Sequence, residues 1–226
     1  MLNGRLLLAK AVERVRKVGL RRFATEAAKR VFHRPPPDDF DQANGTDTGG
    51  YVPLWRFQIP YDSARFGVAY GSPAEARIKE ALDYVPRHTT LVDLGSGKGR
   101  ALIVAARMGF RRVIGVEFVA ELADISRRNL AITSAKAEVV LADAGEFPLP
   151  QGPLCIYLYD PFSARTMGRV AAQLEGRPSE TWVIYLNPAC EPGCAELFDA
   201  IMDRVVERPG LIIWGARSGS CEGPSL

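Results

Sequence analysis

The sequence has few of the residues that build metal centres and disulfide frameworks. Its 226 residues include four cysteines and two histidines, and Cys190 and Cys194 stand four apart in CEPGC. Zinc and redox pairs use a two-residue gap, so we expect free thiols and no metal site. Long apolar runs are also missing, since no window reaches the roughly 18 residues of a membrane span. With no secretory signal pattern at the N-terminus, we expect a cytoplasmic protein.

Charge is unevenly distributed along the chain. Residues 1–34 contain ten Lys/Arg and two Glu, a net charge of +8, whereas the whole chain has +3. Leu8, Val12, Val15 and Phe23 recur near one face at helical spacing, which predicts a basic amphipathic helix. Such a helix packs on the body, binds an anionic membrane surface or nucleic acid, or targets an organelle. The sequence leaves these alternatives open, including a membrane-peripheral location.

Residues 35–71 have no regular period. The stretch HRPPPDDFDQANGTDTGG combines prolines, acids and glycines and predicts a loop or linker. The following YVPLWRFQIPYDSARFGVAYGSP holds six aromatic residues interrupted by prolines. We expect this segment to be an irregular cover on the main domain, a lid over a ligand pocket, or both.

From Ser72 to residue 217 the pattern alternates between strands and helices, and residues 218–226 form a tail. Ser72 and Pro73 predict a helix start, with the serine as cap. The expected helices are 74–85, 100–108, 119–133, 164–175 and 195–203. The expected strands are 89–94, 111–118, 137–143, 153–160, 181–187, 204–208 and 210–217. Continuous apolar strands separated by helices predict a parallel, doubly covered sheet, and the last two strands must pair antiparallel. We expect an α/β fold with seven strands and a terminal antiparallel hairpin.

The glycine-rich stretch LVDLGSGKGR predicts the ligand site. It follows the first strand and opens a helix, where such sheets bind ligands. Its spacing is GxGxG, which matches neither the GxGxxG dinucleotide fingerprint nor the GxxxxGK[ST] phosphate loop. Asp93, two residues before Gly95, does not favour a phosphate and suits a ligand that carries an ammonium or sulfonium group.

Two further acids end the next strands. Glu117 ends VIGVEF, where a carboxylate can accept both hydroxyls of a ribose. Asp143 ends VVLAD, where it can accept from an adenine amino group. With Asp93, these acids indicate a nucleoside with an attached cation and no phosphate.

LVDLGSGKGR, VIGVEF, VVLAD and YLYDPF, in this order and spacing, resemble the class I S-adenosylmethionine-dependent methyltransferases over residues 72–217. The resemblance implies a Rossmann-like doubly wound sheet that binds S-adenosyl-L-methionine. It also implies that Glu117 holds the ribose, that Phe118 covers the adenine, and that the glycine loop carries the methionine part. The implied cofactor residues are Asp93, Gly95, Ser96, Gly97, Gly99, Glu117, Phe118, Asp143 and Ala144.

The segment YLYDPF is similar to the [DN]PP[YF] motif of amino-group methyltransferases, with the second proline absent. An attacking amine gains positive charge, which Asp160 can stabilise and the Phe162 ring can face. The missing proline puts methylation of a nucleic-acid base in particular doubt. Upstream, FGVAYGSPAEARIKEAL resembles the non-SET protein-lysine methyltransferases, which implies that Tyr70 and Ser72 contact the methionine end.

The resulting hypothesis is an enzyme, an S-adenosylmethionine-dependent N-methyltransferase that acts on a protein lysine or another amine. Two alternatives stay open. One is an RNA or DNA methyltransferase whose basic helix holds phosphates. The other is a catalytically silent cofactor-binding scaffold that acts through the same helix.

Overall fold

The structure is a computed structural model that describes residues 37–51, 70–159, 162–177, 180–188 and 193–216. The expected basic helix over 1–34, residues 52–69 of the expected cover and the tail lie outside these residues. Residues 37–226 form one compact unit, separate from residues 1–36.

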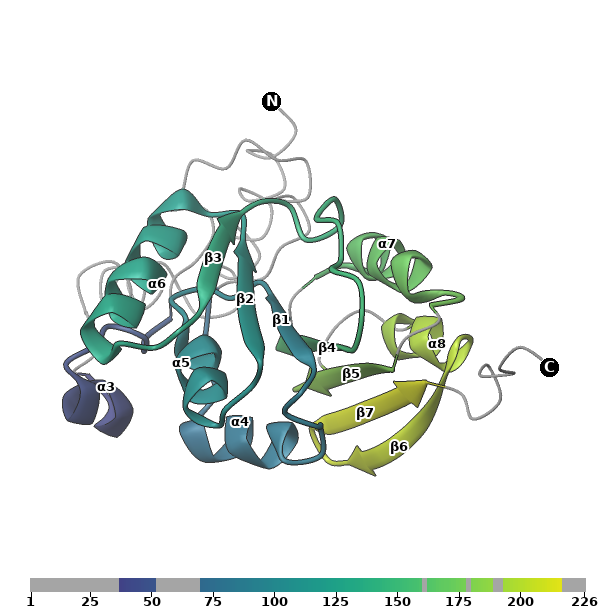
Figure 1. Cartoon of the computed structure of the whole chain (residues 1–226), viewed down its shortest axis with the longest axis horizontal. Coiled ribbons are helices and arrows are strands. Elements are labelled where there is room, and N and C mark those ends of the chain that lie inside the picture. Colours follow the sequence, from purple (N-terminus) through teal and green to yellow (C-terminus); the bar gives the residue numbers. More distant parts are fainter. Residues whose placement is uncertain (1–36, 52–69, 160–161, 178–179, 189–192, 217–226) are drawn as a thin grey trace, which may run out of the picture. The chain divides into compact units, whose positions relative to one another are not determined.

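Seven strands form a single sheet of order β3-β2-β1-β4-β5-β7-β6 (Figure 1). The strands are β1 Thr90–Leu94, β2 Arg112–Glu117, β3 Glu138–Leu141, β4 Leu154–Tyr159, β5 Thr181–Leu186, β6 Met202–Arg208 and β7 Leu211–Ala216. The first five run parallel, and β7 is antiparallel to both of its neighbours, β5 and β6. The predicted parallel sheet with a terminal antiparallel hairpin is therefore confirmed.

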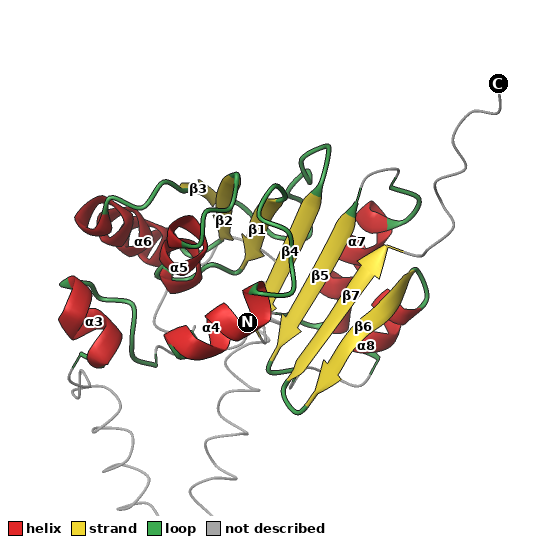
Figure 2. Ribbon diagram, turned by 60° about the horizontal axis from the view of Figure 1, so that its bottom comes forward, coloured by secondary structure: helices red, strands yellow, loops and turns green. Residues whose placement is uncertain are grey.

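Helices cover both faces of this sheet (Figure 2). Helices α4 (Glu75–Leu82) and α5 (Arg100–Arg107) pack on one face, and α7 (Ala164–Leu174) and α8 (Cys194–Asp199) pack on the other. Helix α6 (Ala120–Thr133) lies beside α5, β2 and β3. Each strand sends alternate side chains into the two cores, which is why the strands read as continuous apolar runs.

Two predicted boundaries are wrong. The N-cap of α4 is Ala74, which makes no side-chain capping bond, so Ser72 lies outside the helix. Helix α8 ends at Asp199, and Met202 already belongs to β6, where it pairs with Ala216. Pairing with β7 extends β6 at the expense of the predicted helix.

The expected loop or linker after residue 35 is wrong for residues 39–44. These residues form helix α3 (Asp39–Asn44), with Asp38 as N-cap and Gly45 in the left-handed conformation at the C-cap. The Asp38 side chain accepts from the Asp41 amide, and Phe40 is buried in the core on the α4/α5 side. Two acids of this stretch have structural roles: Asp38 caps the helix and pairs with Arg100, and Asp47 pairs with Lys98.

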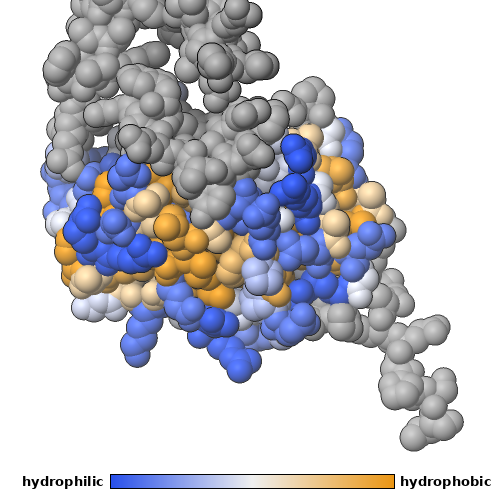
Figure 3. All heavy atoms as spheres, turned by 90° about the horizontal axis from the view of Figure 1, so that it is seen from above, coloured by the Kyte–Doolittle hydropathy of each residue, from blue (hydrophilic) through white to orange (hydrophobic). Residues whose placement is uncertain are grey.

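The described surface mixes apolar and hydrophilic residues. Seen from above, apolar side chains lie across the middle of the molecule, between hydrophilic groups (Figure 3). The exposed large apolar side chains are Tyr51, Ile132, Leu141 and Val205. They come from four separate elements or loops, so they do not form one amphipathic helix face or strand face.

Candidate functional site at the glycine loop

The candidate site lies at the topological switch point of the sheet, where the order of the strands reverses. β2 and β3 lie on one side of β1, whereas β4 lies on the other side, paired with β1 in register from Thr90–Leu154 to Leu94–Leu158. In an open α/β sheet, such a switch point creates a crevice at the carboxyl ends of the strands. The glycine loop, residues 95–99, connects β1 to α5 at this point.

The three loop glycines all have positive φ angles: 81° for Gly95, 52° for Gly97 and 88° for Gly99. At Gly97 an added Cβ would lie 2.2 Å from the Tyr70 ring, and at Gly99 it would lie 2.4 Å from the Ser126 hydroxyl oxygen. Side chains of the protein itself therefore require glycine at positions 97 and 99. The predicted approach of a ligand to the loop backbone stays a prediction.

Glu117 is buried at the carboxyl end of β2 and faces the loop. Its Oε2 accepts a hydrogen bond from the Gly97 amide at 2.7 Å, and its Oε1 accepts one from the Val119 amide at 2.8 Å. Burial raises the pKa of Glu117 to about 7, and the backbone hydrogen bonds oppose that rise. The Phe118 amide contributes a third backbone hydrogen bond. A carboxylate offers about four acceptor sites, so Glu117 can also accept from a ligand hydroxyl.

Asp93 is the second buried acid, on β1 beside Gly115 of β2 and Tyr157 of β4. Burial, with the neighbouring Glu117 charge, raises the pKa of Asp93 to about 8. Among the described residues no hydrogen-bond donor compensates this carboxylate, and the Tyr157 hydroxyl nearby has no partner there either. A buried acid in this state binds a cationic ligand favourably, because the cation lowers its pKa.

Asp143 lies just after β3, next to the end of β2. Its Oδ1 accepts from the Gly145 amide at 2.8 Å, and the Ala142 amide donates to the Glu117 carbonyl at 3.0 Å. Ala144 is buried in the core on the α7/α8 side. The structure thus brings all three strand-end acids to the same edge of the sheet, as the sequence predicts.

The remaining predicted cofactor residues also lie near this edge. Ser96 packs against Gly115, where an added Cβ would lie 2.7 Å from the serine Oγ, and Phe118 directly follows β2. The Tyr70 hydroxyl donates to the Thr48 carbonyl, and the Tyr70 side chain also hydrogen-bonds Ser72. Contact of any of these residues with a cofactor stays a prediction.

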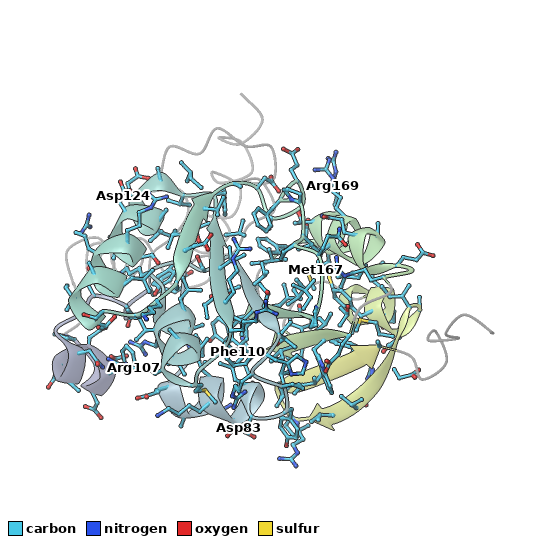
Figure 4. The ribbon with its side chains drawn as sticks, viewed as in Figure 1. Asp83, Arg107, Phe110, Asp124, Met167 and Arg169 are labelled. Carbon is cyan, nitrogen blue, oxygen red and sulfur yellow. The ribbon has the colours of Figure 1, made fainter. Side chains whose placement is uncertain are left out.

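Of the two predicted catalytic residues, Asp160 and Phe162, the structure describes Phe162. Asp160 lies outside the described residues, so its predicted role stays a prediction. Phe162 is buried in the core on the α7/α8 side, in the same cluster as Leu158 and Met167. Figure 4 labels Met167, on α7, in this part of the molecule. This position favours a packing role for the Phe162 ring.

The ion pairs and hydrogen bonds that join Lys98 and Arg100 to residues 38–49 were not predicted from the sequence. Lys98 and Arg100 are buried, and their side chains bind residues 38–49. The Lys98 ammonium donates to Asp47 Oδ1 at 2.8 Å and to the Gly49 carbonyl at 2.9 Å. The Lys98 ammonium is therefore bound within the protein and does not act as the phosphate-binding lysine of a GxxxxGK[ST] loop, whose spacing this sequence also lacks. No pattern in the sequence could have identified these partners, because Lys98 and Asp47 are 51 residues apart and Arg100 and Asp38 are 62 apart.

Within the described ranges, no group of three or more His, Cys, Asp or Glu side chains could hold a metal ion. No described helix is long and apolar enough to cross a membrane. Cys155 and Cys194 are buried, and burial raises the pKa of the Cys155 thiol.

Comparison with known proteins agrees with this geometry. A family model described as a methyltransferase domain matches residues 92–154, from β1 to the start of β4. The ribosomal protein L11 methyltransferase of Geobacter metallireducens is 26% identical over 54% of this chain and 40% of its own length. The chain thus spans less than half the length of that curated relative.

Two solved structures show the same fold at low sequence identity. A predicted N6-adenine-specific DNA methylase from Listeria monocytogenes has a TM-score of 0.54 and 12% identity, covering 65% of this chain and 52% of its own. A protein from Pyrococcus horikoshii has a TM-score of 0.52 and 14% identity, covering 65% of this chain and 92% of its own. The sheet order, the glycine loop with its strand-end acids and the match to a methyltransferase domain over residues 92–154 all agree with the predicted resemblance to the class I S-adenosylmethionine-dependent methyltransferases.

Proposed function

We propose that this protein is an S-adenosylmethionine-dependent N-methyltransferase and that its substrate is an amine, most specifically a protein lysine. The observation that carries the proposal is the pair of buried acids, Asp93 and Glu117, at the glycine loop. A nucleoside with an attached cation satisfies both acids, whereas a pyrophosphate would be repelled by them.

Bound S-adenosylmethionine supplies an electrophilic methyl group carried on a sulfonium. The protein's part is to hold the ribose hydroxyls on the Glu117 carboxylate, which the Gly97 and Val119 amides keep in place. Binding of the sulfonium would favour loss of the Asp93 proton, and the resulting carboxylate attracts the cation in a buried position where the attraction is weakly screened. Asp143, which lies beside the end of β2, is the residue proposed to accept from the adenine amino group.

Methyl transfer to an amine requires alignment and stabilisation of the positive charge that forms on nitrogen. In YLYDPF, Asp160 is the residue proposed to accept hydrogens from that nitrogen, because it directly follows β4 in the sequence. A lysine substrate needs no strong base, since an amine loses its proton with modest effort in a desolvated pocket. The similarity to the ribosomal protein L11 methyltransferase of Geobacter metallireducens supports a protein as substrate.

Calorimetric titration with S-adenosylhomocysteine tests the cofactor site. We expect micromolar binding by the wild type and an affinity loss of roughly 10- to 150-fold in Glu117→Gln, from the about 1.5–3 kcal/mol of charge-assisted hydrogen bonds. Glu138→Gln is the matched control, because Glu138 is exposed on β3 and pairs with Arg112. Binding of NAD in place of S-adenosylhomocysteine would contradict the proposal.

Transfer of a labelled methyl group from S-adenosylmethionine to proteins of a cell extract tests the activity. We expect label on lysine side chains, and a loss of at least tenfold in turnover for Asp160→Ala with cofactor affinity unchanged. Full activity of Asp160→Ala on the true substrate would remove Asp160 from the mechanism. Cofactor binding without transfer to any extract would favour the scaffold alternative.

The basic residues 1–34 support a separate proposal, contact with an anionic surface. Their net charge of +8 and their apolar stripe favour anionic vesicles or a nucleic acid as the contact. Sedimentation of the full chain with phosphatidylserine vesicles at low salt tests the first. Association that is the same at high and low salt would reject both, because each depends on charge.

A further inference from the structure

Residues 38–49, hereafter called the clasp, form hydrogen bonds with Arg100 at the start of α5. This guanidinium is buried, and its Nη2 donates to Asp38 Oδ2 at 2.6 Å while its Nε donates to Thr48 Oγ1 at 2.8 Å. Its Nη1 donates to the Pro73 carbonyl at 3.3 Å, and the Phe40 ring lies 4.8 Å away. All three guanidinium nitrogens are thus used to join the clasp and the start of α4 to α5.

The clasp also holds the glycine loop itself. The Lys98 ammonium binds Asp47 and the Gly49 carbonyl, and it lies 5.3 Å from the centroid of the Tyr70 ring. Asn129 of α6 completes the connection: its Nδ2 donates to the carbonyls of Lys98 and Asp47, both at 3.0 Å. Its Oδ1 accepts from the Asp47 amide at 3.0 Å. Lys98 is therefore fixed by both its side chain and its carbonyl.

Asp41 makes the clasp stiff. Its buried carboxylate accepts from the Thr48 amide and hydroxyl, the Thr46 hydroxyl and the Gly49 amide, at 2.6–2.8 Å. Burial alone would raise the pKa of Asp41, but the hydrogen bonds from Thr48, Thr46 and Gly49 lower it on balance. The four hydrogen bonds to the ionised Asp41 carboxylate fix the backbone of residues 46–49, which includes Asp47. The Asp47 side chain is therefore held in position to pair with Lys98.

The position of Lys98 connects the clasp to the cofactor site. Lys98 stands between Gly97, whose amide donates to Glu117, and Gly99, at the start of α5. Displacement of the Lys98 side chain would move the Gly97 amide and release one of the backbone hydrogen bonds that hold the Glu117 carboxylate. The Tyr70 ring, which fills the space over Gly97, is held by the Thr48 carbonyl of the same clasp.

We propose that the clasp is a positioning element for cofactor binding, in which Asp47 acts through Lys98 to set the glycine loop and the orientation of Glu117. This inference rests on the proposed function, because it assigns a further determinant to the same cofactor site. Asp47, Lys98 and Arg100 are positioning residues in this scheme and have no role in the chemical step.

The geometry separates this role from general stabilisation of the fold. Of the clasp residues, Phe40 is the one apolar side chain in the core clusters of the described residues. Asp47 is partly exposed, with 36% of its side-chain surface accessible, whereas Lys98 is nearly covered at 8%. Asp47→Asn therefore removes a charge at the rim of the loop and leaves both cores unchanged.

Two measurements on full-length Asp47→Asn test the inference. We expect the Kd for S-adenosylhomocysteine to rise five- to twentyfold, with kcat at saturating cofactor unchanged. We expect faster amide hydrogen exchange in the peptide that covers residues 95–99, measured without cofactor. The matched control is Asp124→Asn, which breaks an exposed ion pair with Arg127 on α6 and should change neither. Wild-type affinity together with wild-type exchange in Asp47→Asn would overturn the inference.

A double-mutant cycle identifies the route through Lys98. In Lys98→Met, which removes the buried ammonium, Asp47→Asn should cause no further loss of affinity. An additional loss equal to that in the wild-type background would refute coupling through Lys98. If the wild type fails to bind S-adenosylhomocysteine, the proposed function fails. The exchange comparison then decides the inference alone: faster exchange upholds the positioning of the loop, and unchanged exchange rejects it.

Discussion

The two buried acids at the glycine loop predict an unusual pH dependence of stability. Burial raises the pKa of Asp93 to about 8 and that of Glu117 to about 7, from ordinary values of 3.8 and 4.5. The folded protein therefore keeps protons that the unfolded chain releases above pH 5. Because the native state binds more protons, stability falls as pH rises, and the loss is complete above the folded pKa values.

The magnitude follows from these pKa values. Between pH 6 and pH 8, Asp93 contributes a loss of about 2 kcal/mol and Glu117 a loss of about 1 kcal/mol in the free energy of unfolding. The cofactor-free protein should thus be on the order of 3 kcal/mol less stable at pH 8 than at pH 6. This slope is opposite to that of a protein held together by salt-bridged carboxylates, which gains stability as pH rises from acid.

Urea unfolding of the cofactor-free protein at pH 6, 7 and 8 measures this slope. Asp93→Asn should remove about two thirds of the decrease, since the amide does not titrate. His88→Gln is the control, because it replaces an exposed side chain that pairs with Glu180 and is not part of the glycine-loop site. We expect this variant to keep most of the wild-type slope.

Two outcomes would refute the reasoning. A wild type whose stability is constant from pH 6 to pH 8 would mean that the acids are solvated or paired in the folded state. An unchanged slope in Asp93→Asn would assign the effect to other groups. A cationic ligand adds a further check: S-adenosylmethionine should bind up to about tenfold more tightly per pH unit in this range, and Asp93→Asn should flatten that dependence.

Three further substitutions test the packing around the site and in the core. Gly97→Ala places a Cβ 2.2 Å from the Tyr70 ring at a φ of 52°, and it should lower the free energy of unfolding by about 1–3 kcal/mol; Tyr70→Ala in the same chain should recover part of this in urea unfolding. Phe198→Ala, at a fully buried position whose ring lies 5.2 Å from that of Trp214, should lower it by about 3–5 kcal/mol, and a loss below 1 kcal/mol would contradict the packing. Asp199→Ala removes the acceptor of the buried Trp214 indole at 2.8 Å and should lower it by about 1–3 kcal/mol; a conservative Asp199→Asn should lose less, and equal losses would argue against the hydrogen bond.

The arrangement of strands and helices was predictable because it depends on local periodicity. Continuous apolar runs such as LCIYLY alternate with helical patterns, and a chain of this kind buries both faces of a parallel sheet. The turn at Pro209 and Gly210 likewise predicted the antiparallel hairpin. The errors at Ser72 and after Asp199 are errors of boundary, where pairing and capping by neighbours decide the last residues.

The grouping of the acids at the candidate site was predictable for a related reason. Glycines after a strand and acids at the ends of three strands stand at fixed places relative to the sheet edge once the strand order follows from the topology. Asp93, Glu117 and Asp143 could therefore be grouped from sequence alone. Their pKa values could not, because burial and mutual charge depend on the packed structure.

The sequence by itself thus determined the fold and the position of the ligand site, since both follow from patterns within short windows. Only the tertiary structure decided how the loop is held. Lys98 finds Asp47 across 51 residues, and Arg100 finds Asp38 across 62. A charged side chain pairs with whichever opposite charge the fold brings within about 3 Å, and no periodicity encodes that partner. For the same reason, only the packed chain showed that Gly97 makes room for the Tyr70 ring.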